Sequence, residues 1–175
     1  MSHWLSGRPA GPVFGWSEAF VFRRCTVPTL SDNEVLTELD DRMQLFVRRQ
    51  ETLFVATGEP GDGHDCTFVT GGAGFVRILS VNRLAWPEFD DATLSDAISD
   101  IERDPRVSLL FVDFARGAVG LHINGKAKIL DDDAMRRAYR ALNLDPTLDL
   151  VAERRPARWI TVYVESAHLS APGEL

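Results

Sequence analysis

The sequence predicts an α+β fold that is mainly β, an antiparallel barrel with flanking helices. Between residues 52 and 86, short apolar segments alternate with Gly- and Asn-containing breaks, which is typical of strands joined by tight turns. Residues 119–129 alternate apolar and polar side chains, and helical spacing is confined to three segments. Strands linked by short turns pair in antiparallel fashion, so a barrel is favoured over a parallel sheet.

The first helix is expected over residues 31–50. It begins at Ser31, where Ser-Asp-Asn-Glu has capping-box spacing. Apolar residues then recur at helical intervals, at Val35, Leu36, Leu39, Met43, Phe46 and Val47. Residues 1–30 have no comparable period, so we divide the chain into an N-terminal arm, 1–30, and one domain, 31–175.

Four short strands are expected next, at 52–57, 66–69, 74–79 and 83–86, with a strong turn cluster at 59–63. A second helix begins at Thr93, and the apolar run 107–114 predicts a strand covered on both faces. In 119–129 the alternation continues through Asn124-Gly125. We therefore expect one long strand with glycine on its buried face rather than a hairpin. A third helix over 132–142 and a strand over 159–164 complete the order.

Length, composition and charge exclude several classes of protein. The chain has 175 residues, 45% hydrophobic and 26% charged, as expected for one compact domain. A net charge of −7 argues against binding to nucleic-acid phosphates, which takes a basic face. No run approaches the roughly 18 apolar residues of a membrane helix, and the first fifteen residues do not form a secretion signal. We expect neither a nucleic-acid nor a membrane partner.

Two cysteines, Cys25 and Cys66, are too few for a disulfide framework or a Cys-built zinc site, which indicates a reducing cytoplasm. His64-Asp65-Cys66 puts three potential ligands in a row. Adjacent strand residues point to opposite faces, so this segment is interpreted as a polar turn entering a strand, and no metal is expected.

Several segments match one known family. Gly-Gly-Ala-Gly-Phe-Val-Arg-Ile-Leu at 71–79 precedes Leu-Ala-Trp-Pro at 84–87, and Asp-Pro-Arg-Val-Ser-Leu-Leu-Phe at 104–111 precedes Ile-Asn-Gly-Lys-Ala at 123–127. These segments resemble the flavin-nucleotide-binding branch of the pyridoxamine 5′-phosphate oxidase-like split-barrel proteins. The resemblance implies a homodimer of antiparallel six-stranded split barrels with flanking helices and two FMN sites at the interface.

The resemblance also implies which residues hold the cofactor. Backbone groups would contact the flavin ring and its ribityl chain at Thr67, Phe68 and Val69, and at Ala85, Trp86 and Pro87. Main-chain amides can donate to the oxygen and nitrogen atoms of a flavin whatever the side chain. The indole of Trp86 is either a wall against a planar ring or ordinary barrel packing.

The cations that hold the phosphate in this family are replaced here. Val69, Leu94 and Gly173 stand where the family has Lys or Arg. A phosphate leaving water needs cations or several N–H donors. Arg77 matches the family's arginine, and Thr93 lies at the N-terminus of its predicted helix, so these two are the expected phosphate ligands. Arg83, Lys126 or a residue of the partner subunit are further candidates.

Three hypotheses of function follow. The first is an FMN-binding or deazaflavin-binding oxidoreductase that acts on a small organic substrate, with no catalytic residue assigned because the cofactor carries the chemistry. The alternative is a flavin-free split-barrel enzyme or binding module that has lost the phosphate-anchoring cations. A third is a structural subunit that docks through Trp4, Phe14 and Trp16. His122 is expected to be a solvated or cleft residue, and His168 to cap or pack.

Overall fold

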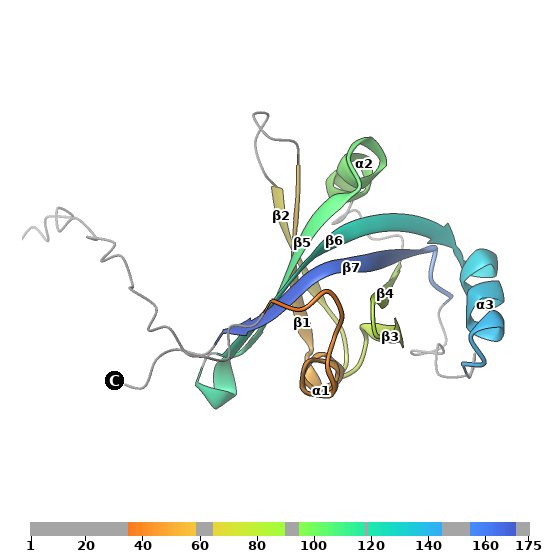
Figure 1. Cartoon of the computed structure of the whole chain (residues 1–175). Helices are drawn as coiled ribbons and strands as arrows, with labels where there is room; N and C mark the ends of the chain where they lie inside the picture. The colour runs from red at the N-terminus through yellow and green to blue at the C-terminus, as the bar shows by residue number, and fades with distance from the viewer. Residues whose placement is uncertain (1–34, 59–64, 90–94, 118, 145–154, 171–175) are drawn as a thin grey trace, which may run out of the picture.

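The computed structural model describes residues 35–58, 65–89, 95–117, 119–144 and 155–170 (Figure 1). The helices in these ranges are α1 (Asp41–Arg49), α2 (Ser95–Arg103), α3 (Asp132–Ala141) and a short 3₁₀ turn, η2 (Phe114–Arg116). The strands are β1 (Thr52–Thr57), β2 (Asp65–Thr70), β3 (Arg77–Ser80), β4 (Arg83–Glu88), β5 (Arg106–Asp113), β6 (Val119–Asp131) and β7 (Arg158–Ser170). The predicted arm, 1–30, lies outside the described residues.

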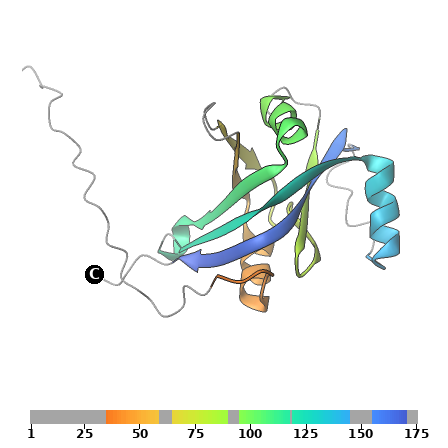
Figure 2. The same cartoon turned by 45° about the horizontal axis from the view of Figure 1, so that its top comes forward.

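The strands form one antiparallel sheet in the order β2-β1-β5-β6-β7-β4-β3. The expected number of six strands is wrong: the sheet has seven and is not closed, with β2 and β3 at its two ends. Six is the number that the resemblance implies, whereas the sequence patterns predict seven strands; β3, expected at 74–79, is a four-residue segment that pairs with β4 in a hairpin. The sheet twists so that β1 and β2 run steeply across β6 and β7 (Figure 2).

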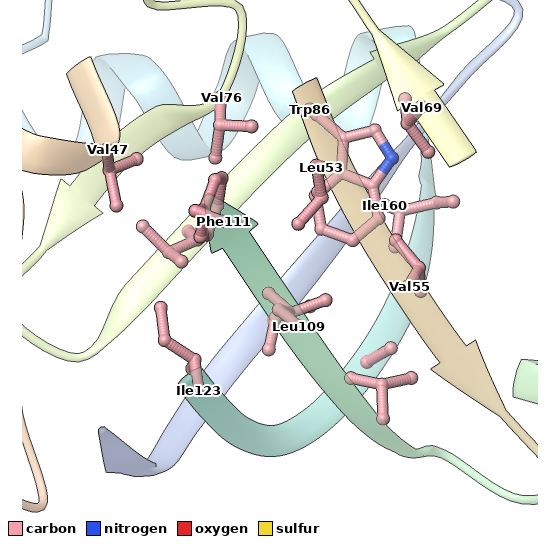
Figure 3. Packing of buried hydrophobic residues seen from close by; sticks show 14 of the residues in the cluster. Val47, Leu53, Val55, Val69, Val76, Trp86, Leu109, Phe111, Ile123 and Ile160 are labelled. Atoms are coloured by element: carbon pink, nitrogen blue, oxygen red, sulfur yellow. The ribbon is translucent and has the colours of Figure 1, made fainter. Parts of the chain in front are cut away.

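The main core fills the inner face of this sheet. Period-two alternation places Leu53 and Val55 of β1, and Leu109 and Phe111 of β5, on that face (Figure 3). Helices α1 and α2 contribute apolar residues to the same cluster and lie on opposite sides of it (Figures 1 and 2). Within the described residues, no helix is long and apolar enough to span a bilayer.

A second, smaller core lies under α3, on the outer face of β4 and β7. It contains Leu79, Ala85, Met135, Tyr139 and Trp159. These residues face away from the main core because their strand neighbours, such as Leu84 and Ile160, point into it. The indole N–H of Trp159 donates to Asp132 Oδ1 at 3.2 Å, which ties the start of α3 to β7. Helix α3 therefore covers the part of the outer face that is formed by β4 and the start of β7.

The first helix starts later than its sequence pattern predicts. The capping box at Ser31 lies outside the described residues, and α1 begins at Asp41, where the Asp40 side chain accepts from Met43 N at 2.8 Å. Leu36 is not helical, because its backbone exchanges two hydrogen bonds with Ala167 of β7, at 2.9 and 2.7 Å. This pairing competes with the helix for the same backbone groups.

The single long strand over 119–129 is confirmed, with Gly125 buried at its centre. A Cβ at Gly125 would lie 2.0 Å from the carbonyl oxygen of Tyr163 on β7. The pairing slips at this point, so that Asn124 pairs with Ser166 while Gly125 pairs with Val164. One extra residue of β7, Glu165, forms a bulge where the two strands approach most closely.

The strand over 107–114 is not covered on both faces, contrary to expectation. Its inward residues are buried, but Ser108 is exposed and Leu110 and Val112 are half-buried. Strand β7 also extends six residues past its predicted end at Val164, to Ser170. Both differences concern the same outer face, where β6 lies between the half-buried apolar residues of β5 and the small polar residues of β7.

Candidate functional site

The outer face of β2, β1, β5, β6 and β7 is built from three cross-strand rows. The central row runs Phe68–Phe54–Leu110–His122–His168, each residue paired with the next across neighbouring strands. The rings of Phe54 and Phe68 lie 5.1 Å apart between centroids. The imidazoles of His122 and His168 stack with centroids 4.7 Å apart and planes 2° from parallel. The row is therefore aromatic at both ends.

Polar and small residues flank the central row. On one side Ser108 Oγ donates to Asn124 Oδ1 at 2.7 Å, and Asn124 Nδ2 donates to Ser166 Oγ at 3.1 Å. These bonds fix the orientation of the amide across three strands. We call the three rows together the uncharged face; its members are Cys66, Phe68, Thr70, Thr52, Phe54, Ala56, Ser108, Leu110, Val112, Gly120, His122, Asn124, Ser166, His168 and Ser170.

A cavity of about 440 Å³ opens on the uncharged face. Phe54, Leu110 and the exposed Phe114 supply most of its apolar lining, and His122, His168 and Asn124 supply polar groups. A largely apolar cavity with a few convergent polar groups is the usual form of a small-molecule site.

His122 lies half-buried in this cavity, as expected for a cleft residue. Burial lowers the pKa of His122 from its ordinary value of 6.5, and the neighbouring His168 lowers it further. The neutral imidazole is thus favoured. The sequence did not predict that His168 lines this cavity. The predicted strand ended at Val164, because the residues after it do not alternate between apolar and polar.

The backbone groups expected to hold a flavin lie on strands with unpaired edges. In the described part of the chain β2 pairs only with β1, so one edge of Thr67, Phe68 and Val69 has no neighbouring strand. Strand β4 pairs with β7 along its length, but its pairing with β3 ends at Ala85. Trp86 and Pro87 therefore lie beyond the reach of β3.

The Trp86 side chain packs in the main core and is 0% exposed. Its Nε1 is buried and has no hydrogen-bond partner among the described residues. In Figure 3 this nitrogen lies on the side of the indole that faces Val69 of β2. An unpaired buried donor is unusual in proteins, and it fits a group that would bring an acceptor to the space between β2 and β4.

Of the two expected phosphate ligands, the structure describes Arg77, which does not share a face with Val69. The Val69 side chain points into the main core, whereas Arg77 pairs with Ala85 and so faces the side covered by α3. Thr93, Leu94 and Gly173 lie outside the described residues. Asp100 of α2 is an acid on the helix that follows Thr93 and Leu94 in the sequence. Its carboxylate accepts from Thr57 Oγ1 at 3.1 Å and forms an ion pair with Arg103 at 3.5 Å.

The potential metal ligands of the sequence do not gather into a site in the described ranges. Asp65 and Cys66 are exposed neighbours on β2, and Asp65 Oδ1 accepts from the Cys66 amide at 2.8 Å. His64 lies outside these ranges. No group of three His, Cys, Asp or Glu that could hold a metal ion occurs among the described residues.

The strands thus form an open antiparallel sheet that ends at β2 and β3, and part of β4 extends beyond its pairing with β3. The sequence model of the pyridoxamine 5′-phosphate oxidase family matches residues 39–162. The chain therefore belongs to the pyridoxamine 5′-phosphate oxidase family. No curated protein sequence matches it.

Solved structures with the same fold are distant in sequence. A candidate pyridoxamine 5′-phosphate oxidase from Listeria innocua superposes with a TM-score of 0.52 and 16% identity, covering 74% of this chain and 95% of that one. A HupZ variant from Group A Streptococcus has a TM-score of 0.51 and 17% identity, covering 75% and 98%. General Stress Protein 26 from Bacillus anthracis has a TM-score of 0.50 and 18% identity, covering 75% and 93%. At these identities the likeness concerns the fold.

Proposed function

We propose that this protein binds a flavin-type cofactor, FMN or a deazaflavin, and acts in the cytoplasm as an oxidoreductase on a small organic substrate. The observation that carries the proposal is the buried Nε1 of Trp86, which has no hydrogen-bond partner among the described residues and faces Val69 of the edge strand β2 (Figure 3). Family membership supports the same assignment. A planar ring with acceptor atoms at its rim could accept a hydrogen bond from Trp86 Nε1 and also bond with the unpaired backbone groups of β2.

The chain's own residues would bind and orient the ring. Amide groups of Thr67–Val69 would donate to the polar rim of the ring, and the carbonyls of Trp86 and Pro87 would accept from it. The apolar cluster behind Val69 and Trp86 would exclude water from one side of the site. The bound cofactor would supply the electron or hydride transfer itself.

We further propose that the protein works as a homodimer joined through the uncharged face. Its fifteen residues include no Lys, Arg, Asp or Glu, although such residues make up 26% of the chain. Each chain carries a net charge of −7, so two copies repel unless their contact surface is free of acids. Burying this face removes apolar surface from water without desolvating a charge.

Replacing Trp86 with Phe tests the cofactor site. Trp86→Phe keeps an aromatic ring in the core but removes the unpaired N–H, so FMN or deazaflavin binding should weaken about fivefold. Binding is measured by the loss of cofactor fluorescence on titration into the full chain. Trp159→Phe is the matched control, because its N–H already donates to Asp132 on the far side of the sheet.

Two outcomes would contradict the cofactor proposal. One is wild-type protein that quenches neither FMN nor deazaflavin fluorescence at tens of micromolar, about 6 kcal/mol of binding free energy. The other is an equal loss of binding in both tryptophan variants. The first outcome would favour the alternative, a flavin-free enzyme or binding module. A specific observation supports that alternative: Val69 is buried where the family has a cation, and Arg77 faces the other side of the sheet.

A further inference from the structure

We propose that the cavity in the uncharged face binds a small neutral aromatic molecule that carries an amide group. The cavity has a volume of about 440 Å³, which lies within the range of small-molecule sites. Its lining residues come from β1, β2, β5, β6, β7 and the turn η2 of a single chain. Each protomer therefore holds a complete site.

Aromatic rings form much of the cavity lining. The Phe54 ring lies on β1, the stacked rings of His122 and His168 lie on β6 and β7, and Leu110 lies between them. Phe54 and His122 are two strand spacings apart, about 10 Å between backbones, which a molecule of one or two rings can bridge. Because aromatic rings favour offset-stacked and edge-to-face contacts with one another, this lining suits a planar aromatic ligand.

Phe114 of η2 adds a further ring to the lining. It is 72% exposed, more than any other large hydrophobic residue that the structure describes. A ligand that covers this ring removes apolar surface of both partners from water, which favours binding. Phe114 is therefore a contact that can be removed without opening the main core.

The cavity selects against charged ligands. None of the described residues that line it is Lys, Arg, Asp or Glu. Burial lowers the pKa of His122, so its neutral form is favoured as well. A carboxylate or ammonium group in the cavity would lose its hydration without gaining a partner charge. A neutral molecule is bound at no such cost.

Ser108 and Asn124 supply hydrogen-bonding groups beside these rings. Ser108 Oγ donates to Asn124 Oδ1 at 2.7 Å, and Asn124 Nδ2 donates one hydrogen to Ser166 Oγ at 3.1 Å. Within the described residues no further group engages the second hydrogen on Nδ2 or the lone pairs of Ser108 Oγ, so both can bond with a ligand. One donor beside one acceptor matches the carbonyl oxygen and the N–H group of an amide.

This cavity is separate from the proposed cofactor site. It shares no lining residue with the backbone contacts expected at 67–69 and 85–87, and it lies on the outer face, opposite the core into which Val69 and Trp86 point. The proposed dimer would leave it in place, because a hollow lies below the plane at which two faces meet. Binding of the aromatic amide therefore depends neither on the cofactor nor on the dimer.

The test uses two probes with the same ring system, neutral 2-naphthamide and anionic 2-naphthoate. Each is equilibrated by dialysis with the full chain, without added flavin. Wild-type protein should bind 2-naphthamide with a dissociation constant of ~100 µM or tighter. It should bind 2-naphthoate at least about tenfold more weakly, because the carboxylate would lose its hydration in a cavity without a cation.

Three variants locate the site. Phe114→Ala should weaken 2-naphthamide binding about fivefold, because less apolar surface is covered. Ser108→Lys places a cation at the cavity and should strengthen 2-naphthoate binding about tenfold over wild type. Ser108 is exposed, so this substitution leaves the core unchanged. Leu45→Ala, at a 46% exposed position of α1, is the matched control and should bind both probes as wild type does.

Circular dichroism of each variant shows whether the fold is retained, and either cavity variant suffices for the test. The proposal is overturned if wild-type protein shows no saturable binding of 2-naphthamide up to ~1 mM, or if it binds 2-naphthoate equally tightly. It is equally overturned if Phe114→Ala and Leu45→Ala bind 2-naphthamide alike, or if Ser108→Lys leaves 2-naphthoate binding unchanged.

Discussion

His122 makes the uncharged face sensitive to acid, and its ring stacks on that of His168. Protonation of His122 would place a positive charge on a partly buried part of this surface. Partial burial already lowers the pKa of His122, with His168 adding to the effect. In its neutral form the His122 ring contributes flat apolar surface to the face.

The lowered pKa of His122 predicts a loss of stability on acidification. The unfolded chain binds a proton near pH 6.5, whereas the folded chain binds it only at lower pH. The free energy of unfolding is therefore retained above pH 6.5 and falls as the pH decreases below it. Thermal unfolding midpoints between pH 7.5 and 5 should fall less in His122→Asn than in wild type.

The carboxylates whose pKa is lowered do not interfere with this measurement. Arg106 lowers the pKa of Asp104 from 3.8 through side-chain and backbone hydrogen bonds. Burial would raise the pKa of Asp132, but hydrogen bonds from Arg136 and Trp159 outweigh it. The pKa of each carboxyl lies below its ordinary value of 3.8, so neither group titrates between pH 7.5 and 5. An equal fall in midpoint in His122→Asn and wild type would show that His122 is not the sensitive group.

Among the elements, β6 and β7 meet at a point where a side chain has no room. The position of a Cβ on Gly125 would be 2.0 Å from a backbone oxygen, and a backbone atom cannot rotate away as a side chain can. The bulge at Glu165 limits relaxation further, since the register of both strands is set on either side of it.

Gly125→Ala should therefore destabilise the protein by about 2 kcal/mol or more, as overpacking against rigid neighbours does. Urea unfolding followed by circular dichroism measures the change. Gly72→Ala is the matched control, because nothing lies within 4 Å of a Cβ at Gly72. A Gly125 variant as stable as the Gly72 variant would mean that the two long strands separate easily at this point.

Local sequence patterns predicted most elements to within a few residues, and they failed where long-range pairing decides the structure. The alternation around Gly125 was sufficient to identify a 13-residue strand. The start of α1 was missed because Leu36 pairs with Ala167, which lies 131 positions further along the chain. The end of β7 was missed because its outward residues are small and polar, a composition without periodic signal.

At the scale of the whole molecule, the uncharged face could not have been found from the sequence. Its central row joins residues from five strands, and each step depends on the register of a different strand pair. Short motifs mark the strands β2 and β4 whose backbone would contact a cofactor, so the sequence could propose these contacts. The phosphate ligands stay a prediction, since Arg77 lies on the face opposite Val69 once the strands are paired and Thr93 lies outside the described residues.

Leu110 lies at the centre of the uncharged face, so a charge there should separate the proposed dimer. An aspartate between Phe54 and His122 would have to lose its hydration at the interface, which costs several kcal/mol without a partner charge. Light scattering on the wild-type protein should give twice the chain mass of 19.5 kDa. Leu110→Asp should give the chain mass itself while keeping the circular dichroism of the folded protein.

Val81→Asp is the matched control for this substitution. Val81 is 46% exposed in the turn between β3 and β4, away from the five strands of the uncharged face, so its variant should remain dimeric. A monomeric wild-type protein would contradict the dimer, and a dimeric Leu110→Asp protein would move the interface elsewhere. Because His122 pairs with Leu110 across β5 and β6, protonation of His122 should also favour dissociation of wild-type dimers, at a pH below its ordinary pKa of 6.5. Dissociation that follows the titration of His122 would link its acid sensitivity to assembly of the molecule.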